Sequence, residues 1–558
     1  MKNTAPNARL LYYSTPQPKT PDFARGGPLD FSLFSATIGD VAKNKNVSSE
    51  GRVSQYAKGR SPSDRPDKVT SALGYCVCNG RALFSVLPPS VRRARGAQAR
   101  PHDRKETIVH SMDSTALFSK TPPLKLFFTA AVPGAVSMLA SSLYSLIDGI
   151  LVGNFLDGTS FAALNLAMPF VIINFALSDL VGVGSSVPIS VALGRGDRKE
   201  ANNVFTCACI LILAAGVVMG AAMFTAAPFL IGMMGAEGEF ASLAVEYLRT
   251  YAMCSPFTTI LYAVDNYLRI SGYIRGSMCI NILMSVLCVT FEFVFLGVLD
   301  LGLWAAAFGS SLGMFICVVL AFIPFVRGKA LLHFVRPTFE LRTLRQIVAC
   351  GSPTFLNNIA GRITSILMNM FLVRLGGELA VSVYGVLMYV DGFIQPLLYG
   401  MCDSLQPAVG YNWGAQKFSR VRAIEKCCFT AAAAVSLLSA AVIALLPGPI
   451  TRLFIAGAEG EALAIGVTAL RIFSLTYLTR WLSFATQSYM LAVEKALPAS
   501  ILSVSTALLF PVILLVLLGP LGLDGLWINF PATSALAAVL ALVILRRTRA
   551  DLHRPDAP

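Results

Sequence analysis

Long apolar runs separated by short polar breaks dominate the chain from about residue 120 onward. The runs Ala201–Ala236, Ala496–Leu523 and Gly525–Leu545 contain no charged residue, and each is long enough to cross a bilayer as an α-helix. Because lipid offers no hydrogen-bond partners to the backbone, repeated runs of this kind exclude open sheets. Dividing the apolar body at its charged or Gly- and Pro-rich breaks predicts twelve spans: 124–155, 161–193, 201–234, 240–269, 276–299, 303–326, 343–375, 380–411, 421–454, 462–491, 497–519 and 525–545.

The charge of the connections alternates along the chain. Every second connection is basic, as at Arg195–Lys199, Arg327–Arg345 and Arg546–Arg549, whereas the intervening loops are acidic, as at Glu237 and Asp300. Lys and Arg accumulate in cytoplasmic loops of membrane proteins. Both termini are therefore predicted to be cytoplasmic, which by itself requires an even number of spans.

The second half of the apolar body repeats the first. Gly235–Glu239 recurs as Gly457–Glu461 at an offset of 222 residues, and Gly302–Trp304 recurs as Gly525–Trp527 at an offset of 223. Matches spread along a chain at a slowly drifting offset indicate internal duplication. Two six-span halves enter from the same side, so the predicted fold is all-α and integral to the membrane, with two parallel pseudo-symmetric lobes. Three further pairs match at an offset of 220: Pro133 and Pro353, Met168 and Met388, and Gly194 and Gly414.

Composition agrees with a membrane protein and locates the excess positive charge. Of the 558 residues, 55% are hydrophobic and 14% are charged, and the net charge is +14. The segment before Met112 holds 18 Lys and Arg against 8 Asp and Glu, so no nucleic-acid partner is expected of the apolar body. We predict a disordered appendage at 1–111, a first lobe at 120–326, a cytoplasmic linker at 327–342, a second lobe at 343–548 and a tail at 549–558. An open alternative is that translation starts at Met112.

Three segments are similar to the multidrug and toxic compound extrusion (MATE) family, and in particular to its bacterial MepA-like subgroup. They are Asp148–Gly153 in the first span, Leu268–Gly272 at the end of the fourth and Gln406–Ala415 at the end of the eighth. The resemblance covers about residues 120–548. It implies a bacterial plasma-membrane antiporter that exports drugs or metabolites, mostly amphipathic cations, in exchange for H⁺ or Na⁺. The Gly194–Lys199 loop also resembles a major facilitator motif, but it is one residue short of that spacing.

Acidic residues inside the spans are the candidates for ion coupling. Asp148 and Glu292 are predicted at similar depth near the outer ends of spans one and five, and Asp179 lies in the middle of span two. A charge inside a bilayer usually faces a cavity or a partner, and burial favours the protonated carboxyl. Glu292 also stands where the resembled family often has an Asp, and Ser310 where it has a Thr of the ion site. The competing interpretation is hydrated acids near the membrane interface.

A second group of residues is predicted to contact substrate. Taken singly, the Met and aromatic residues are explained more simply by helix packing or lipid contact, and the alternative for the acids is hydrogen bonding between helices. Asp391 and Asp403 lie about three turns apart on span eight and so share roughly one face. Aromatic and Met side chains near the acids suit varied lipophilic cations. Pro133 is the predicted hinge, since proline permits a helix to bend. The remaining candidates are Met168, Met388, Tyr389, Tyr399 and Asn174.

Other functions fit the sequence less well. A lipid or lipid-linked glycan flippase of the same superfamily needs a large basic cavity, whereas we expect basic residues in the loops and acids inside the membrane. An enzyme is not expected, because no phosphate-binding loop, Ser and His pair or metal cluster is seen and all four histidines lie outside the spans. We therefore predict a monomeric transporter in membrane lipid with no metal and no cofactor beyond its coupling ion.

Overall fold

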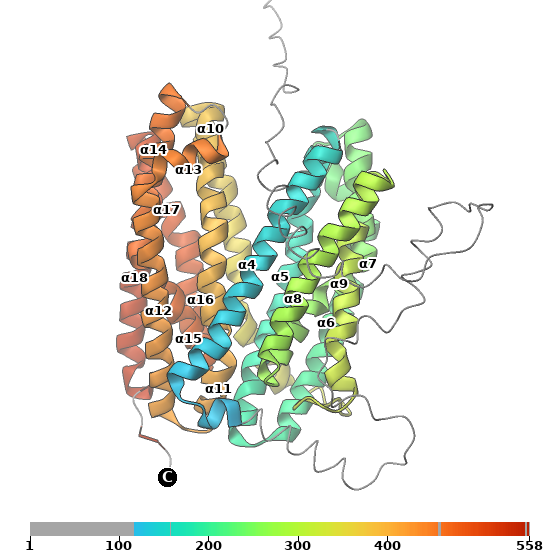
Figure 1. Ribbon diagram of the computed structural model, residues 1–558, viewed down its shortest axis with the longest axis vertical. Coiled ribbons are helices and arrows are strands. Elements are labelled where there is room, and N and C mark those ends of the chain that lie inside the picture. The colour runs from blue at the N-terminus through green and yellow to red at the C-terminus, as the bar shows by residue number, and fades with distance from the viewer. Residues whose placement is uncertain (1–115, 157, 456–458, 553–554, 557–558) are drawn as a thin grey trace, which may run out of the picture. The chain divides into compact units, whose positions relative to one another are not determined.

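The computed structural model describes residues 116–156, 158–455, 459–552 and 555–556. The predicted appendage at 1–111 lies outside these residues. Within the described part of the chain every regular element is a helix (Figure 1), as the apolar runs predict. The linker at 327–340 is irregular, and three of its backbone amides, at His333, Val335 and Thr338, donate to polar side chains of the third span.

Six spans form the first lobe. The fifth span changes from an α-helix into a π-helix directly after Glu292. A positive φ of 81° at Gly302 then starts the sixth span, in a conformation that glycine adopts readily. The helices are α4 (Pro123–Phe155), α5 (Gly158–Arg195), α6 (Arg198–Met233), α7 (Gly238–Ile270), α8 (Ile274–Glu292) with η2 (Phe293–Val298), and α9 (Leu303–Val326).

The second lobe repeats this arrangement with more interruptions. Spans seven and eight run together as α10 (Leu341–Asp403), which is broken at Gly377 by a φ of 60° and a ψ of −152°. The bent pair α14 and α15 forms span ten, with an angle of 42° between its parts. The other helices are α11 (Gln406–Gly414), α12 (Phe418–Leu445), α13 (Pro447–Phe454), α14 (Gly460–Ser474), α15 (Thr476–Ala492), α16 (Ala496–Val504), η3 (Ser505–Leu509), α17 (Phe510–Leu518), η4 (Gly519–Leu521) and α18 (Leu523–Leu552).

The helices reproduce the twelve predicted spans. Nine helices in the described residues are long and apolar enough to cross a membrane, and the bent pair α14 and α15 makes a tenth. One of the nine is the continuous stretch Leu341–Gly414, which holds two spans on either side of Gly377. Helix α7 is the twelfth, and its 33 residues are less apolar than the others because Glu246, Arg249, Asp265 and Arg269 lie on it.

Helix α4 packs against both lobes. Its first half contributes Leu126, Phe127 and Ala130 to an apolar cluster formed mainly by α10, α12, α15 and α18 of the second lobe. Its second half contributes Val152 to a cluster of first-lobe helices. Figure 1 shows this course, with α4 slanting from the base of the second lobe toward α5 and α8. The first span therefore links the lobes, although the chain order assigns it to the first lobe alone.

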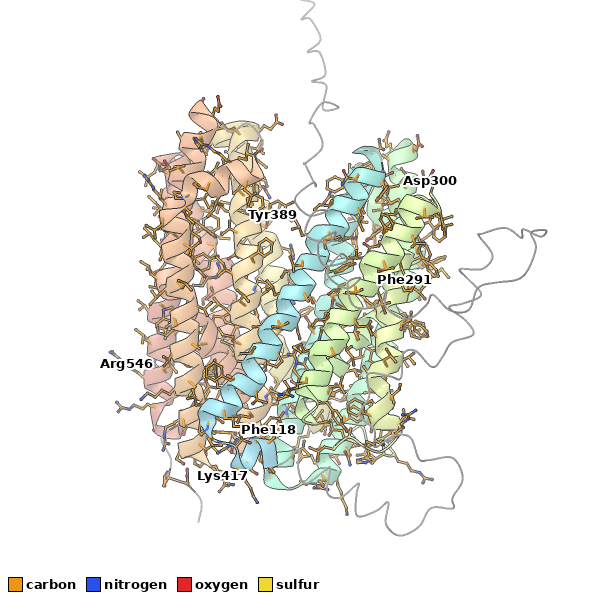
Figure 2. All side chains as sticks on the ribbon, in the orientation of Figure 1. Phe118, Phe291, Asp300, Tyr389, Lys417 and Arg546 are labelled. Atoms are coloured by element: carbon orange, nitrogen blue, oxygen red, sulfur yellow. The ribbon has the colours of Figure 1, made fainter. Side chains whose placement is uncertain are left out.

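The two ends of the helix bundle differ in charge and in how closely the lobes approach. Figure 2 shows Lys417 and Arg546 at one end, the basic end, and Asp300 at the other, the acidic end. Toward the basic end the backbones touch: a Cβ atom at Gly351 of α10 would lie 1.8 Å from the carbonyl oxygen of Leu180 on α5. Only a residue without a side chain fits at this spacing. Toward the acidic end the two groups of helices diverge in Figure 1.

A polar bridge joins the lobes at the basic end. Glu494, in the turn between α15 and α16, lies 3.3 Å from Nη2 of Arg195 at the end of α5. Its other oxygen accepts a 2.8 Å hydrogen bond from Nε2 of Gln346 on α10. Burial raises the pKa of the Glu494 carboxyl, and Arg195 and Gln346 oppose that shift. The bridge exists only while the lobes are in contact at this end.

Candidate functional site

Three first-lobe helices bring an acidic cluster together near the acidic end. Tyr144 and Asp148 lie one turn apart on α4 and therefore share a face. Glu292 is the last residue of α8, and the π-helix η2 follows it at once. Single π-helical turns inside a helix are frequent at functional sites, where they redirect side chains. Ser310 completes the cluster from α9.

Two small residues on α9 explain why these side chains meet. A Cβ atom at Gly309 would lie 3.1 Å from the backbone nitrogen of Glu292, and one at Gly313 would lie 2.9 Å from that of Cys288. Glycines four residues apart form a groove that lets two membrane helices approach closely. This packing of α9 on α8 places Ser310 beside Glu292.

The hydrogen bonds of the cluster converge on one oxygen of Glu292. Its side chain is fully buried, and Oε1 accepts a 3.0 Å hydrogen bond from the Tyr144 hydroxyl and a second from Ser310 Oγ. The carboxyl of Asp148 lies within hydrogen-bonding reach of Glu292. Among the described side chains, none donates a conventional hydrogen bond to Oε2 of Glu292.

This geometry requires a proton or a cation between the two acids. Ionised carboxylates are acceptors only, so Asp148 and Glu292 repel each other unless one of them is protonated or a cation bridges them. The hydroxyls of Tyr144 and Ser310 orient one oxygen of Glu292, and the other oxygen remains available. The cluster is therefore suited to binding and releasing a single positive charge.

The structure assembles part of the predicted ion-coupling set. Asp148, Glu292 and Ser310 come together, while Asp179 does not join them. The sequence analysis missed Tyr144, although its position one turn before Asp148 could have indicated it. Asp179 lies on α5 at the junction of the lobes, where its side chain is bonded to Asn358 of α10.

A second pair of acids lies at that junction. Asp179 is close enough to Asp403 of α10 for the two charges to interact. Oδ1 of Asp403 accepts hydrogen bonds of 2.8 Å from Gln406 and 3.1 Å from Ser488. Asp403 is thus held by polar neighbours within the second lobe, and its carboxyl faces an acid of the first.

The second lobe encloses a cavity of about 560 Å³ with a mixed polar and aromatic lining. Two guanidinium groups, Arg362 and Arg480, and one carboxylate, Asp391, are its charged residues. Tyr399 and Phe484 pack edge to face on its wall with ring centroids 4.0 Å apart. Five side-chain amides also line it: Asn357, Asn358, Gln395, Gln487 and Asn529.

Asp391 is already paired inside this cavity. Arg480 approaches both of its oxygens, with Nη1 2.9 Å from Oδ1 and Nη2 3.2 Å from Oδ2, and Tyr477 donates a 2.6 Å hydrogen bond to Oδ1. The expectation that charges inside the spans are acidic is therefore wrong, since Arg362 and Arg480 lie on the membrane-spanning helices α10 and α15. Both were visible in the sequence, because an unbroken apolar helix contains no arginine without a reason.

The other predicted substrate residues divide between two environments. Met388 and Tyr399 line the cavity with Asp391, whereas Tyr389 is half exposed and stacks on Phe454 with centroids 5.5 Å apart (Figure 2). Met168 packs against an apolar cluster of the first lobe. Buried Asn174 donates a 2.8 Å hydrogen bond to Ser255 Oγ. Pro133 lies inside α4, which continues through it as one helix.

Duplicated six-span lobes and a bundle closed at one end are the architecture of a membrane transporter. The sequence profile of the MatE family matches residues 133–294 and 353–517, and so matches once in each lobe. The chain belongs to the MatE family. The two matches begin at Pro133 and Pro353, at the repeat offset of 220 found in the sequence.

Known proteins with a similar sequence or fold agree with this assignment. The multidrug export proteins MepA of Staphylococcus saprophyticus and Staphylococcus aureus are 24% and 23% identical to this chain, over 77% of it and 95% of each relative. A structure described as the outward-facing conformation of a multidrug resistance MATE transporter of the MOP superfamily superimposes with a TM-score of 0.75. It is 23% identical and covers 79% of this chain and 98% of that one.

Proposed function

We propose that this protein is an ion-coupled multidrug efflux transporter of a bacterial plasma membrane. Its cargo is small amphipathic cations, which it exchanges for H⁺, or for Na⁺, without a cofactor and without acting as an enzyme. The observation that carries the proposal is the pairing of partly buried Asp148 with fully buried Glu292. Among the described side chains, none donates a conventional hydrogen bond to the second carboxylate oxygen of Glu292. The MepA relatives support the export of drugs.

The arrangement of the lobes supports transport by alternating access. If the basic end faces the cytoplasm, as the charge of its loops indicates, the glycine contacts and the Arg195–Glu494 bridge close the cytoplasmic side. The divergence at the acidic end then corresponds to an outward-facing state, with both termini inside the cell. One chain contains both lobes, so we propose that a monomer is sufficient.

Helix α4 is suited to connect ion binding with the movement of the lobes. It carries Tyr144 and Asp148 of the ion cluster, and its first half packs against the second lobe. Deprotonation leaves two negative charges within hydrogen-bonding reach of each other, which α4 and α8 relieve by separating or by accepting another cation. Protonation removes the repulsion. The charge of the pair therefore changes the packing of a helix that touches both lobes.

The test is efflux of ethidium from bacterial cells lacking their own pumps and expressing this chain. Asp148→Asn and Glu292→Gln are expected to reduce energy-dependent efflux to the level of cells without the protein. Asp300→Asn makes the same chemical change at an exposed acid after η2 and is expected to retain wild-type efflux. A proton uncoupler and the removal of Na⁺ identify the coupling ion.

Two results would contradict this proposal. The proposed efflux function would be contradicted if wild-type protein is inserted in the membrane and yet expels neither ethidium nor a related cation. Wild-type efflux in both acid variants would retain the transporter and reject the ion site, and the Asp179 and Asp403 pair would then be substituted next.

A further inference from the structure

A pocket of about 370 Å³ lies near the basic end of the second lobe, apart from the ion cluster and the second-lobe cavity. Its lining includes four basic side chains, Arg422 and Lys426 on α12 and Arg546 and Arg549 on α18. The two on each helix are three or four residues apart and therefore share a face. Figure 2 places Arg546 at the edge of the second lobe that faces away from the first. This part of the surface faces lipid when the protein is in a membrane.

The positive charge of the pocket is only partly offset by the protein itself. Lys426 and Arg546 are exposed, and neither forms an ion pair with a carboxylate in the described part of the chain. Buried Glu425 of α12 is the one acid among the described lining residues. Four basic groups against one acid leave a net positive charge, which an anion complements.

The basic side chains lie at the level of the membrane surface. Lys426 is eight residues after the start of α12 and Arg546 six residues before the end of α18, or roughly 12 and 9 Å along the two axes. The predicted spans 421–454 and 525–545 begin and end close to these residues. Basic pockets between spans at such a boundary recognise the headgroups of anionic lipids.

Apolar side chains line the pocket about one turn deeper in the membrane. Phe429 follows Lys426 by three residues on α12, and Leu542 precedes Arg546 by four residues on α18. Tyr489 of α15 packs edge to face on Phe429 between these helices, with ring centroids 6.4 Å apart. The pocket thus has a charged part at the surface and an apolar part below it, in the order of the headgroup and acyl chains of a phospholipid.

We propose that this pocket binds an anionic membrane phospholipid, with its phosphate on Lys426 and Arg546 and an acyl chain along Phe429 and Leu542. The lipid bridges α12 and α18 and offsets the repulsion between their basic side chains. A soluble phosphate ester shares the charge but lacks the apolar contact. The inference goes beyond the proposed efflux function and does not depend on it, because the pocket lies outside the ion cluster and the second-lobe cavity.

The test measures lipid binding to purified full-length protein that has been delipidated in detergent. Dioleoyl phosphatidylglycerol and dioleoyl phosphatidylcholine are matched probes, because they share acyl chains and a phosphate and differ in net charge. Native mass spectrometry counts the bound lipids at each lipid concentration. Wild-type protein is expected to bind phosphatidylglycerol about thirtyfold more tightly, at about fivefold for each of the two unpaired basic residues.

A double variant and a matched control locate the site. Lys426→Gln combined with Arg546→Gln is expected to weaken phosphatidylglycerol about thirtyfold and to bind phosphatidylcholine like wild type. Lys417→Gln combined with Arg547→Gln removes the same charge from exposed residues of the basic end outside the lining, and is expected to bind both lipids like wild type. Each single variant, Lys426→Gln or Arg546→Gln, is expected to lose about fivefold, which preserves the comparison if the double variant does not fold.

Three results would overturn the inference: equal wild-type affinity for the two lipids, equal weakening of both lipids in the double variant, or the same loss in the control variant. Displacement of phosphatidylglycerol by sn-glycerol 1-phosphate at equal concentration would replace the proposed lipid with a soluble phosphate ester. Because binding is measured without transport, the outcome is independent of whether the protein expels ethidium.

Discussion

The two lobes share an ancestry visible in the sequence, but their buried chemistry differs. The first lobe holds an acidic pair, partly buried Asp148 and fully buried Glu292. The second holds a cavity of about 560 Å³ that contains Arg362 and the Arg480–Asp391 pair. Duplication thus supplied two similar scaffolds, and the charged side chains of these two sites differ between them.

Equivalent positions show how completely the acidic site is confined to the first lobe. At the repeat offsets of 220 and 223, Asp148 corresponds to Met368 and Glu292 to Leu515. Met368 and Leu515 are buried in the same apolar cluster, which includes Trp527. Where the first lobe places two carboxyls, the second lobe therefore packs two apolar side chains.

The charged pair of the second lobe is equally specific to it. At offsets of 220 and 222, Asp391 corresponds to Val171 and Arg480 to Thr258. Val171 is buried in an apolar cluster, and Thr258 donates a 3.3 Å hydrogen bond to the carbonyl oxygen of Ser255. The charged side chains of the two lobes therefore occupy positions that are not equivalent in the repeat.

Replacing Glu292 of the first lobe by leucine, the residue at the equivalent position of the second lobe, should have the largest effect on efflux. Glu292→Leu makes the first lobe resemble the second, and ethidium efflux is expected to fall to background because the variant removes one half of the proposed ion site. The thermal midpoint should stay within about 2 °C of wild type or rise, since a buried carboxyl is replaced by an apolar side chain of similar size. A large fall in the midpoint would indicate a structural role for Glu292.

The reverse exchange should damage the second lobe. Leu515→Glu places a carboxyl in an apolar cluster, where no positive charge is placed to pair with it. The substitution is expected to destabilise the protein by about 3–5 kcal/mol. Thermal unfolding and the monodisperse fraction after purification report the effect. Leu521→Glu, an exposed substitution in the turn before α18, serves as the matched control. Equal stability of the Leu515→Glu and Leu521→Glu variants would mean that the second lobe, like the first, tolerates a buried carboxyl at this position.

The smallest expected effect concerns pH and the contact between the lobes. The pKa of Glu494 is raised by burial when the basic end is closed, so protons bind more tightly to the closed form than to a form that exposes Glu494 to water. Lower pH on this side should therefore favour closure. Distances between spin labels at residues 239 and 461, at the acidic end, measure the shift.

Two variants separate Glu494 from other titrating groups in that experiment. Glu494→Gln should remove the pH response and resemble the protonated wild type, whereas Glu340→Gln, an exposed acid just before α10, should retain it. A response that persists unchanged in Glu494→Gln would assign the titration to another group.

The sequence predicted the helical framework closely. All twelve predicted spans coincide with single helices or with runs of consecutive helices, because span length and hydrophobicity follow from the thickness of the bilayer. The break at Gly377 in α10 lies between the predicted spans 343–375 and 380–411. The acids Asp148 and Glu292 were found by the same reasoning, since an ionisable residue in an apolar run is conspicuous.

The arrangement within the candidate sites was predicted less well. Asp391 and Asp403 share a helix face in projection, yet Asp391 lines the cavity and Asp403 lies at the lobe junction, because they are three turns apart along α10. Asp179 was grouped with the first-lobe acids on depth alone, and it faces the second lobe instead. Depth along a helix is readable from residue count, whereas the direction in which a side chain points depends on neighbouring helices.

The sequence by itself determined the membrane class, the twelve spans, the duplication and the alternation of basic and acidic ends. Each of these depends on local hydrophobicity, charge or repetition. Only the tertiary structure decided that Ser310 and Tyr144 both donate to Glu292, that Arg480 pairs with Asp391, and that Arg362 lines the same cavity as that pair. These contacts join residues from different helices, and glycines such as Gly309 and Gly351 set how closely those helices approach.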